Sequence, residues 1–183
     1  MPIKTSVQAT IGIDFDGTFA ESKEIFGKGI VGDLQKNFMN FVSSLPLLDK
    51  LSAKMAGRIT AKYLNAMKIN NELVMFVEFA EKSGITPVIV TRNSNVAAIK
   101  EILEKKGLFM EVIRCNNPMK TCAPFVIVDD NPLTTLLREA AGLPSIWWGA
   151  NMFIASFLER FGVPAAYNNK QLSEALESIR RRL

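Results

Sequence analysis

The sequence has 183 residues, 48% of them hydrophobic and 22% charged, and this length and composition favour a single globular domain. It contains no histidine, which excludes Ser-His-Asp and Cys-His catalysis, histidine-ligated zinc and phosphohistidine chemistry. The net charge is only +4 and the positive residues are spread along the chain, so no nucleic-acid partner is expected.

The two cysteines, Cys115 and Cys122, form neither a CxxC pair nor the loop of a Cys-x5-Arg phosphatase. We interpret them as reduced thiols of an intracellular protein. The N-terminal residues do not resemble a secretory signal, and no apolar run approaches the roughly 20 residues that span a bilayer. We therefore expect a cytoplasmic protein with no membrane partner.

The N-terminal part combines one predicted strand with a predicted helical insertion. The strand covers 7–15, and glycines that indicate turns follow it at positions 17, 27, 29 and 32. Apolar residues then recur at helical spacing over 34–45 and 51–63, which predicts one helix from 33 up to Pro46 and a second over roughly 49–68. Because 19–70 shows no strand pattern, we interpret it as a small helical cap. Its two helices are expected to form a mobile lid, with a homodimer interface as the alternative.

From residue 71 onward, short apolar strands alternate with helices. The first helix is predicted to have Asn71 as its N-cap and to end before Gly84. The remaining strands are predicted over 88–90, 109–113, 125–128, 146–148 and 165–167, and the helices over 96–106, 132–140, 151–160 and 171–181. Such alternation is typical of a parallel sheet covered on both faces. The predicted fold class is α/β, a doubly wound parallel sheet, with 1–18 and 71–183 as the core and 19–70 as the cap.

Acidic side chains follow two of these strands at their carboxyl ends, where open parallel sheets bind ligands. Asp14 and Asp16 end the first strand, and Asp129 and Asp130 end a later one. Four carboxylates in one crevice repel one another unless a cation lies among them. Oxygen ligands without His or Cys favour Mg²⁺.

A hydroxyl ends another strand. Thr91 precedes a helix that we expect Asn93 or Ser94 to cap, and a helix N-terminus beside a hydroxyl suits phosphate. Asn131 is the predicted N-cap of the helix that begins at Pro132. A cation, a phosphate and an unpaired carboxylate together predict phosphoryl transfer through an acyl-phosphate.

These residues resemble the motifs of the haloacid dehalogenase (HAD)-like superfamily. The stretch Ile11-Gly12-Ile13-Asp14-Phe15-Asp16-Gly17-Thr18 resembles its first motif, and Thr91 after Val88-Ile89-Val90 resembles the second. Val126-Ile127-Val128-Asp129-Asp130 resembles the fourth motif in its double-Asp form. The third motif is a single lysine, for which Lys120 is the best candidate and Lys105 and Lys106 are the alternatives. The resemblance covers 11–15 and 85 to about 148, and implies a Rossmann-like HAD core.

The resemblance also implies a role for each residue. Asp14 would be the nucleophile that becomes aspartyl-phosphate, and Asp16 would be the general acid and base. Thr91 would hold the phosphoryl oxygens, while Lys120 would neutralise charge. The implied Mg²⁺ ligands are Asp14, Asp16 through its main-chain carbonyl, Asp129 and Asp130, where Asp130 would bind the ion through water or orient Lys120. The implied substrate-side residues are Gly17, Thr18, Thr91, Arg92 and Asn93, although a surface or capping role fits Arg92 and Asn93 equally well.

Taken together, the residues and the resemblance predict a Mg²⁺-dependent phosphatase that acts on a small phosphomonoester. The alternative is a non-catalytic or regulatory HAD-like protein that binds a phosphorylated ligand or partner through the same crevice. A sugar phosphate, a nucleotide and a phosphoprotein remain open as the substrate.

Overall fold

The computed structural model of the protein describes residues 9–21, 68–115 and 126–182. The predicted cap helices lie outside these residues except for Lys68, the predicted end of the second helix, which is in a strand instead. Lys120 and Cys122 also lie outside them. None of the helices in the described part of the chain has the length and apolar character needed to cross a membrane.

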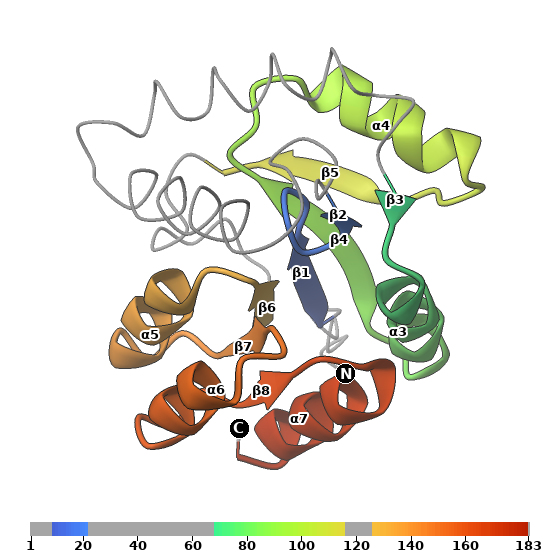
Figure 1. Ribbon diagram of the computed structural model, residues 1–183. Coiled ribbons are helices and arrows are strands. Elements are labelled where there is room, and N and C mark those ends of the chain that lie inside the picture. The colour runs from blue at the N-terminus through green and yellow to red at the C-terminus, as the bar shows by residue number, and fades with distance from the viewer. Residues whose placement is uncertain (1–8, 22–67, 116–125, 183) are drawn as a thin grey trace, which may run out of the picture.

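The core is a six-stranded, entirely parallel sheet (Figure 1). Its order is β5-β4-β1-β6-β7-β8, so the N-terminal strand lies near the centre. The strands are β1 (Thr10–Asp14), β4 (Thr86–Thr91), β5 (Glu111–Arg114), β6 (Val126–Asp129), β7 (Ser145–Trp148) and β8 (Ala165–Ala166). Since β1 pairs with both β4 and β6, their carboxyl ends meet at one edge. This arrangement confirms the predicted α/β class.

Helices cover both faces of the sheet, as the alternating pattern predicted. In Figure 1, α3 (Asn71–Lys82), α4 (Val96–Lys105) and α7 (Asn169–Arg182) lie on one face, and α5 (Pro132–Ala140) and α6 (Met152–Glu159) on the other. The strands are rich in Val and Ile, whose branched side chains suit a sheet buried on both sides. The largest core cluster joins these strand residues to apolar helix faces, including Leu73, Phe76, Ile99, Leu103, Leu172 and Leu176.

Two helix starts differ from the predicted positions. The N-cap of α3 is Asn70, whose side-chain oxygen accepts a hydrogen bond from the Glu72 N–H at 3.0 Å, because Asn70 has extended backbone and Asn71 is already helical. The N-cap of α4 is Asn95, which accepts from the Ala98 N–H at 3.2 Å. The side chain of Asn93 is engaged elsewhere, as described below. Asn131 caps α5 as predicted, with Pro132 in the first turn.

The two ends of the predicted cap form a small antiparallel ribbon, so the expectation of no strand in 19–70 is wrong at its ends. β2 (Ala20–Glu21) pairs with β3 (Lys68–Ile69), with Ala20 opposite Ile69. The Asn70 N–H also donates to the Phe19 carbonyl at 2.9 Å. Strands of two residues are too short to leave an alternating pattern in the sequence. The ribbon brings the chain back to the core beside the loop that follows β1.

Candidate active site

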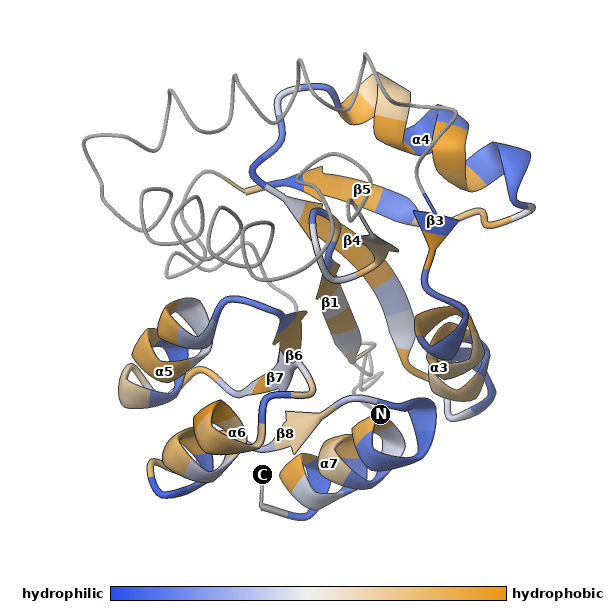
Figure 2. Cartoon of the chain, viewed as in Figure 1, coloured by the Kyte–Doolittle hydropathy of each residue, from blue (hydrophilic) through white to orange (hydrophobic). Residues whose placement is uncertain are grey.

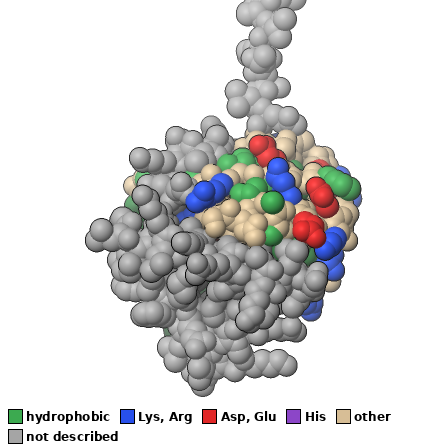
Figure 3. All heavy atoms as spheres, turned by 90° about the horizontal axis from the view of Figure 1, so that it is seen from above, with side chains coloured by type: hydrophobic (Ala, Val, Ile, Leu, Met, Phe, Trp, Pro, Cys, Tyr) green, Lys and Arg blue, Asp and Glu red, His purple; other side chains and the backbone are tan. Residues whose placement is uncertain are grey.

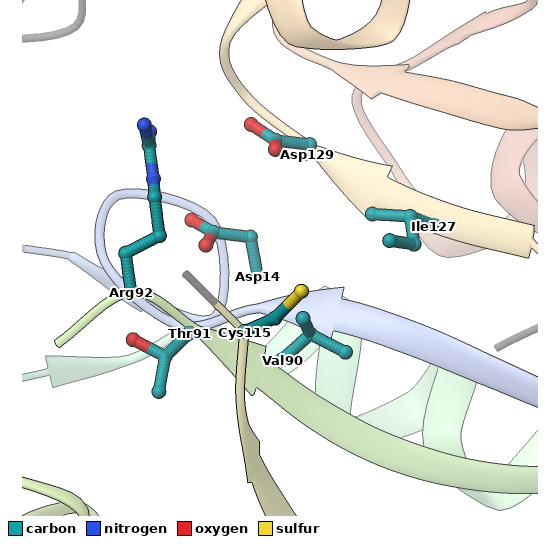
Figure 4. Close-up of a pocket in the computed structure, with 7 residues that line it drawn as sticks. All are labelled: Asp14, Val90, Thr91, Arg92, Cys115, Ile127 and Asp129. Atoms are coloured by element: carbon teal, nitrogen blue, oxygen red, sulfur yellow. The ribbon is translucent and has the colours of Figure 1, made fainter. Parts of the chain in front are cut away.

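The candidate site lies where the carboxyl ends of β1, β4 and β6 meet. Asp14 ends β1, Thr91 ends β4 and Asp129 ends β6. A pocket there is lined by Asp14, Val90, Thr91, Arg92, Cys115, Ile127 and Asp129. In Figure 4, the Asp14 carboxylate lies between the Arg92 side chain and the Asp129 carboxylate. The predicted grouping of strand ends is therefore present.

Three carboxylates form a tight acidic cluster. Asp14, Asp129 and Asp130 each offer one carboxylate oxygen, and these oxygens all lie within 4.8 Å of one another. Asp129 and Asp130 are only 7% and 9% exposed, so water screens their repulsion poorly. An all-oxygen donor set of this kind fits a hard divalent cation such as Mg²⁺. The cluster could therefore hold a metal ion.

The side chain of Asp16 does not belong to this cluster and turns toward the end of β4. Its carboxylate accepts from the Thr91 hydroxyl at 3.3 Å and from the Asn93 amide nitrogen at 3.3 and 3.4 Å. The Thr91 hydroxyl oxygen in turn accepts from the Asn93 N–H at 2.9 Å. Thr91 and Asn93, both expected on the substrate side, therefore orient the carboxylate of Asp16.

Asp130 is held through both of its backbone groups. Its N–H donates to the hydroxyl oxygen of the fully buried Thr18 at 2.9 Å. Its carbonyl accepts from the Trp147 indole N–H at 3.0 Å. Trp147 is 4% exposed and packs in the core, but its hydrogen bond could not be predicted from the sequence. The only sequence signal was its place on the strand that follows the acidic pair.

Gly17 meets two requirements of the same turn. Its φ is +95°, a backbone angle that residues other than glycine rarely adopt. A Cβ at this position would also lie 2.7 Å from an Asp130 carboxylate oxygen. Gly17 therefore leaves room for the Asp130 carboxylate and the Thr18 hydroxyl accepts from the Asp130 N–H, so both residues predicted on the substrate side support the acidic loop.

Burial and mutual repulsion raise the pKa values of Asp14, Asp16 and Asp129. Burial raises the pKa of Asp14 well above its ordinary value, and the charges of Asp129, Asp130 and Asp16 raise it further. Burial, followed by the charge of Asp130, raises the pKa of Asp129 to about 7. Burial raises the pKa of Asp16 to about 6, against the lowering effect of its hydrogen bonds from Asn93 and Thr91.

Two arginines place positive charge near these carboxyls. Arg92 lines the pocket and lowers the pKa values of Asp14, Asp16 and Asp129. Arg138 on α5 is only 3% exposed, and its charge also lowers the pKa of Asp129. Burial lowers the pKa of Arg138 itself, and the nearby Asp129 acts in the opposite direction. Arg138 could not be singled out from its residue type or position, because an arginine on a helix is ordinarily a surface residue.

The alternative third-motif lysines lie away from the site. Lys105 is the last residue of α4 and Lys106 is its C-cap. The other end of α4, its beginning, is the end that follows β4 and the site. Lys105 forms an exposed ion pair with Glu101 at 2.7 Å. Figure 3 shows the molecule from above, and the acidic and basic side chains of the described residues on this face are mixed rather than separated by charge. Both lysines therefore fit solvated positions at a helix end, and Lys120 lies outside the described residues.

Comparisons with known proteins identify the fold. The sequence matches no protein-family model and none of the curated proteins. A hydrolase from Pseudomonas syringae superposes with a TM-score of 0.60 at 15% identity, covering 94% of this chain and 99% of that chain. A Had-superfamily hydrolase from Ehrlichia chaffeensis gives 0.51 at 13% identity, covering 94% and 97%. The protein has a HAD-like fold. A phosphoserine phosphatase gives 0.52 at 16% identity, covering 93% and 98%, in agreement with this assignment.

The HAD-like core predicts a specific cost for removing the indole N–H beneath the acidic loop. Trp147→Phe keeps a ring in place but leaves the buried Asp130 carbonyl without this donor. We expect this loss to lower the free energy of unfolding by about 1–3 kcal/mol. Urea denaturation measures the change. The matched control is Trp148→Phe, since the Trp148 indole has no hydrogen-bond acceptor among the described residues. Equal losses for the two variants would contradict the prediction.

The raised carboxyl pKa values predict an unusual pH dependence for the metal-free HAD-like core. Carboxyls with raised pKa bind more protons in the folded state, so their contribution to stability is complete below about pH 4 and is lost as pH rises through about 6 and 7. In EDTA, we expect the free energy of unfolding to fall between pH 5 and 8, by on the order of a few kcal/mol. Urea denaturation at several pH values measures this slope.

A matched variant isolates the source of that slope. Asp129→Asn removes one titrating group while keeping the shape of the side chain, so the decline with pH should become shallower. A free energy of unfolding that is flat or rises across this range, or an identical slope in Asp129→Asn, would rule out the acidic cluster as its cause.

Proposed function

We propose that the protein is a Mg²⁺-dependent phosphomonoesterase that works through an aspartyl-phosphate on Asp14. The observation that carries this proposal is the separation of two neighbouring carboxylates. Asp14 belongs to the cluster with Asp129 and Asp130, whereas Asp16 is turned away to Thr91 and Asn93. One carboxylate therefore belongs to a candidate cation site, and the other is held beside it by polar groups. This is the arrangement that nucleophilic and acid-base catalysis require.

The residues present fit a divalent cation. Asp14, Asp129 and Asp130 would hold Mg²⁺ through oxygen atoms, and their burial and close approach favour a bound positive charge. When bound, the ion would offset the charge of the carboxylates and of a phosphate dianion. The main-chain carbonyl of Asp16 is proposed as a further ligand.

In the first half-reaction, a carboxylate oxygen of Asp14 attacks the phosphorus atom of the phosphomonoester. The bond from phosphorus to the ester oxygen breaks as the new bond to Asp14 forms. Asp16, in its protonated form, gives its proton to the departing oxygen and releases the alcohol. A pKa of about 6 leaves both protonation states of Asp16 available near neutral pH, as this role requires.

In the second half-reaction, water attacks the phosphorus atom of the aspartyl-phosphate. Asp16, now ionised, takes a proton from that water, and the bond from phosphorus to the Asp14 oxygen breaks. Inorganic phosphate leaves, and the Asp14 carboxylate and protonated Asp16 are restored. Thr91 and Arg92 border the pocket and are proposed to contact the phosphoryl oxygens. Lys120 is proposed to supply the third-motif charge.

The solved structures with the same fold support the class of reaction. They include a protein described as a hydrolase and one described as a phosphoserine phosphatase. The substrate of this chain is proposed only as a small phosphomonoester. The alternative, a HAD-like protein that binds a phosphorylated ligand without turnover, makes a different prediction in the experiments below.

Turnover of a generic aryl phosphate tests the proposal directly. With added Mg²⁺, the purified protein should hydrolyse p-nitrophenyl phosphate, and excess EDTA should abolish the reaction because the clustered carboxylates would repel the dianion. Release of p-nitrophenol measures the rate. Asp129→Asn, which removes one cluster charge, should raise the Mg²⁺ concentration needed for half-maximal rate. Full activity in EDTA would overturn the metal requirement, and phosphate binding without turnover would favour the alternative.

Substituting the two aspartates separates their roles. Asp14→Asn removes the nucleophile and should eliminate turnover. Asp16→Asn should lower the rate about 10²- to 10⁴-fold because it removes the general acid and base. Trapping of the phosphoenzyme should then detect covalently bound phosphate in Asp16→Asn but not in Asp14→Asn. Glu101→Gln, an exposed change on α4, serves as the control with unchanged rate. Wild-type turnover by Asp14→Asn would exclude the covalent mechanism.

A further inference from the structure

Helix α6 exposes a stripe of large apolar side chains to solvent. Met152 is 78% exposed, Phe153 90%, Phe157 52% and Phe161, just beyond the helix, 55%. We call these four residues the α6 stripe. Figure 2 shows α6 as a mostly hydrophobic helix at the outside of the sheet. By contrast, the outward positions of α4 carry Lys100, Glu101, Glu104 and Lys105.

Packing against the sheet does not account for the α6 stripe. The inner face of α6 already carries Leu158, which is 1% exposed and packs with Trp147 and Val163. Ile154 and Ala155 complete that contact. A surface helix needs one apolar face to cover the core, and α6 has two. The second face is therefore suited to a contact outside the described fold.

The charges around the α6 stripe indicate a protein surface as its occupant. Within residues 152–161, the charged residues are Glu159 and Arg160, and their charges cancel. An anionic membrane surface or a nucleic acid is bound through an excess of Lys and Arg, which is absent here. A neutral apolar face of this kind matches the composition of a protein interface core.

The exposed area of the α6 stripe is large enough for an interface between two copies of this surface. Taking about 200 Å² for a fully exposed side chain of this size, the α6 stripe exposes roughly 550 Å². This value lies at the upper end of the largest apolar patches on typical monomers, about 300–600 Å². Two copies together would bury about 1,100 Å², above the roughly 1,000 Å² that a specific interface requires.

The spacing of the three phenylalanines is self-complementary. Phe153, Phe157 and Phe161 recur every four residues, so the row is symmetric about Phe157. The Phe157 and Phe161 rings already contact each other, with centroids 5.0 Å apart and planes tilted by 51°. A two-fold axis at Phe157 would place the row antiparallel to its copy, with Phe153 against the partner's Phe161.

We propose that the α6 stripe is the interface of a homodimer, in which two α6 helices pack antiparallel about Phe157. The apolar area, the absence of net charge and the symmetric spacing together select a second copy of this chain as the occupant. The proposal is independent of the proposed phosphatase function, because none of its residues lines the pocket at Asp14. Dimer formation and catalysis can therefore be tested separately.

Light scattering of the full chain during size-exclusion chromatography tests the dimer. In the micromolar range, the wild-type protein should have twice the mass of one chain, and Phe157→Glu should have the mass of one chain because two carboxylates would face each other. Phe109→Glu is the matched control: Phe109 is 86% exposed but lies before β5, and this variant should remain dimeric.

A second variant distinguishes the two-fold contact from a folding defect. Phe157→Lys should also be monomeric by itself, and mixing it with Phe157→Glu should restore a particle of two chains, since opposite charges then meet at the axis. A monomeric wild type, a dimeric Phe157→Glu, or failure of the mixture to associate would overturn the proposal. Circular dichroism of each variant verifies the fold.

Discussion

The close approach of three carboxylates is the constraint on which the rest of the site depends. Asp14, Asp129 and Asp130 place oxygen atoms within 4.8 Å of one another at the end of the sheet. The protein offsets part of this repulsion with a hydrogen bond from the Asn131 N–H to Asp129 at 2.8 Å and with the charges of Arg92 and Arg138. The pKa values nevertheless remain raised, so these partners do not fully stabilise the ionised cluster. The remaining repulsion is what gives such a cluster its affinity for a cation.

Such a cluster keeps its geometry only if its backbone is held firmly, and the support comes from several strands. The Thr18 hydroxyl after β1 accepts from the Asp130 N–H, and the Trp147 indole of β7 donates to the Asp130 carbonyl. Gly17 leaves no side chain in the space that the Asp130 carboxylate occupies. On the other side, Thr91 at the end of β4 orients Asp16. The site therefore forms only in the assembled sheet. Strands β1, β4, β6 and β7, or the turns that directly follow them, each contribute at least one of the residues that hold it in place.

The sequence supported the parts of this arrangement that depend on order along the chain. Alternating strands and helices, with acids or a hydroxyl after three strands, are enough to predict that Asp14, Thr91 and Asp129 meet at one edge. Contacts that depend on strand register and on single backbone angles could not be predicted. Trp147 reaches the Asp130 loop because Asp129 is paired with Trp147 in the sheet. The caps at Asn70 and Asn95 differ from their neighbours only in backbone conformation, which residue type does not reveal.

The different positions of the Asp14 and Asp16 carboxylates follow from a turn in the chain rather than from the residue types, which are the same. In an extended strand, side chains two residues apart point to the same side, so both carboxylates would enter the acidic cluster. The chain leaves the strand after Asp14, with the fully buried Phe15 fixed in the core and Gly17 at a positive φ. Asp16 is then turned toward the hydroxyl and amide of Thr91 and Asn93. The two carboxylates then have different environments: a cation bound by Asp14, Asp129 and Asp130 would favour the ionised form of Asp14 as the nucleophile, while Asp16, outside the cluster, would exchange protons. The turn at Gly17 therefore separates the two carboxylates that the proposed chemistry uses in different ways.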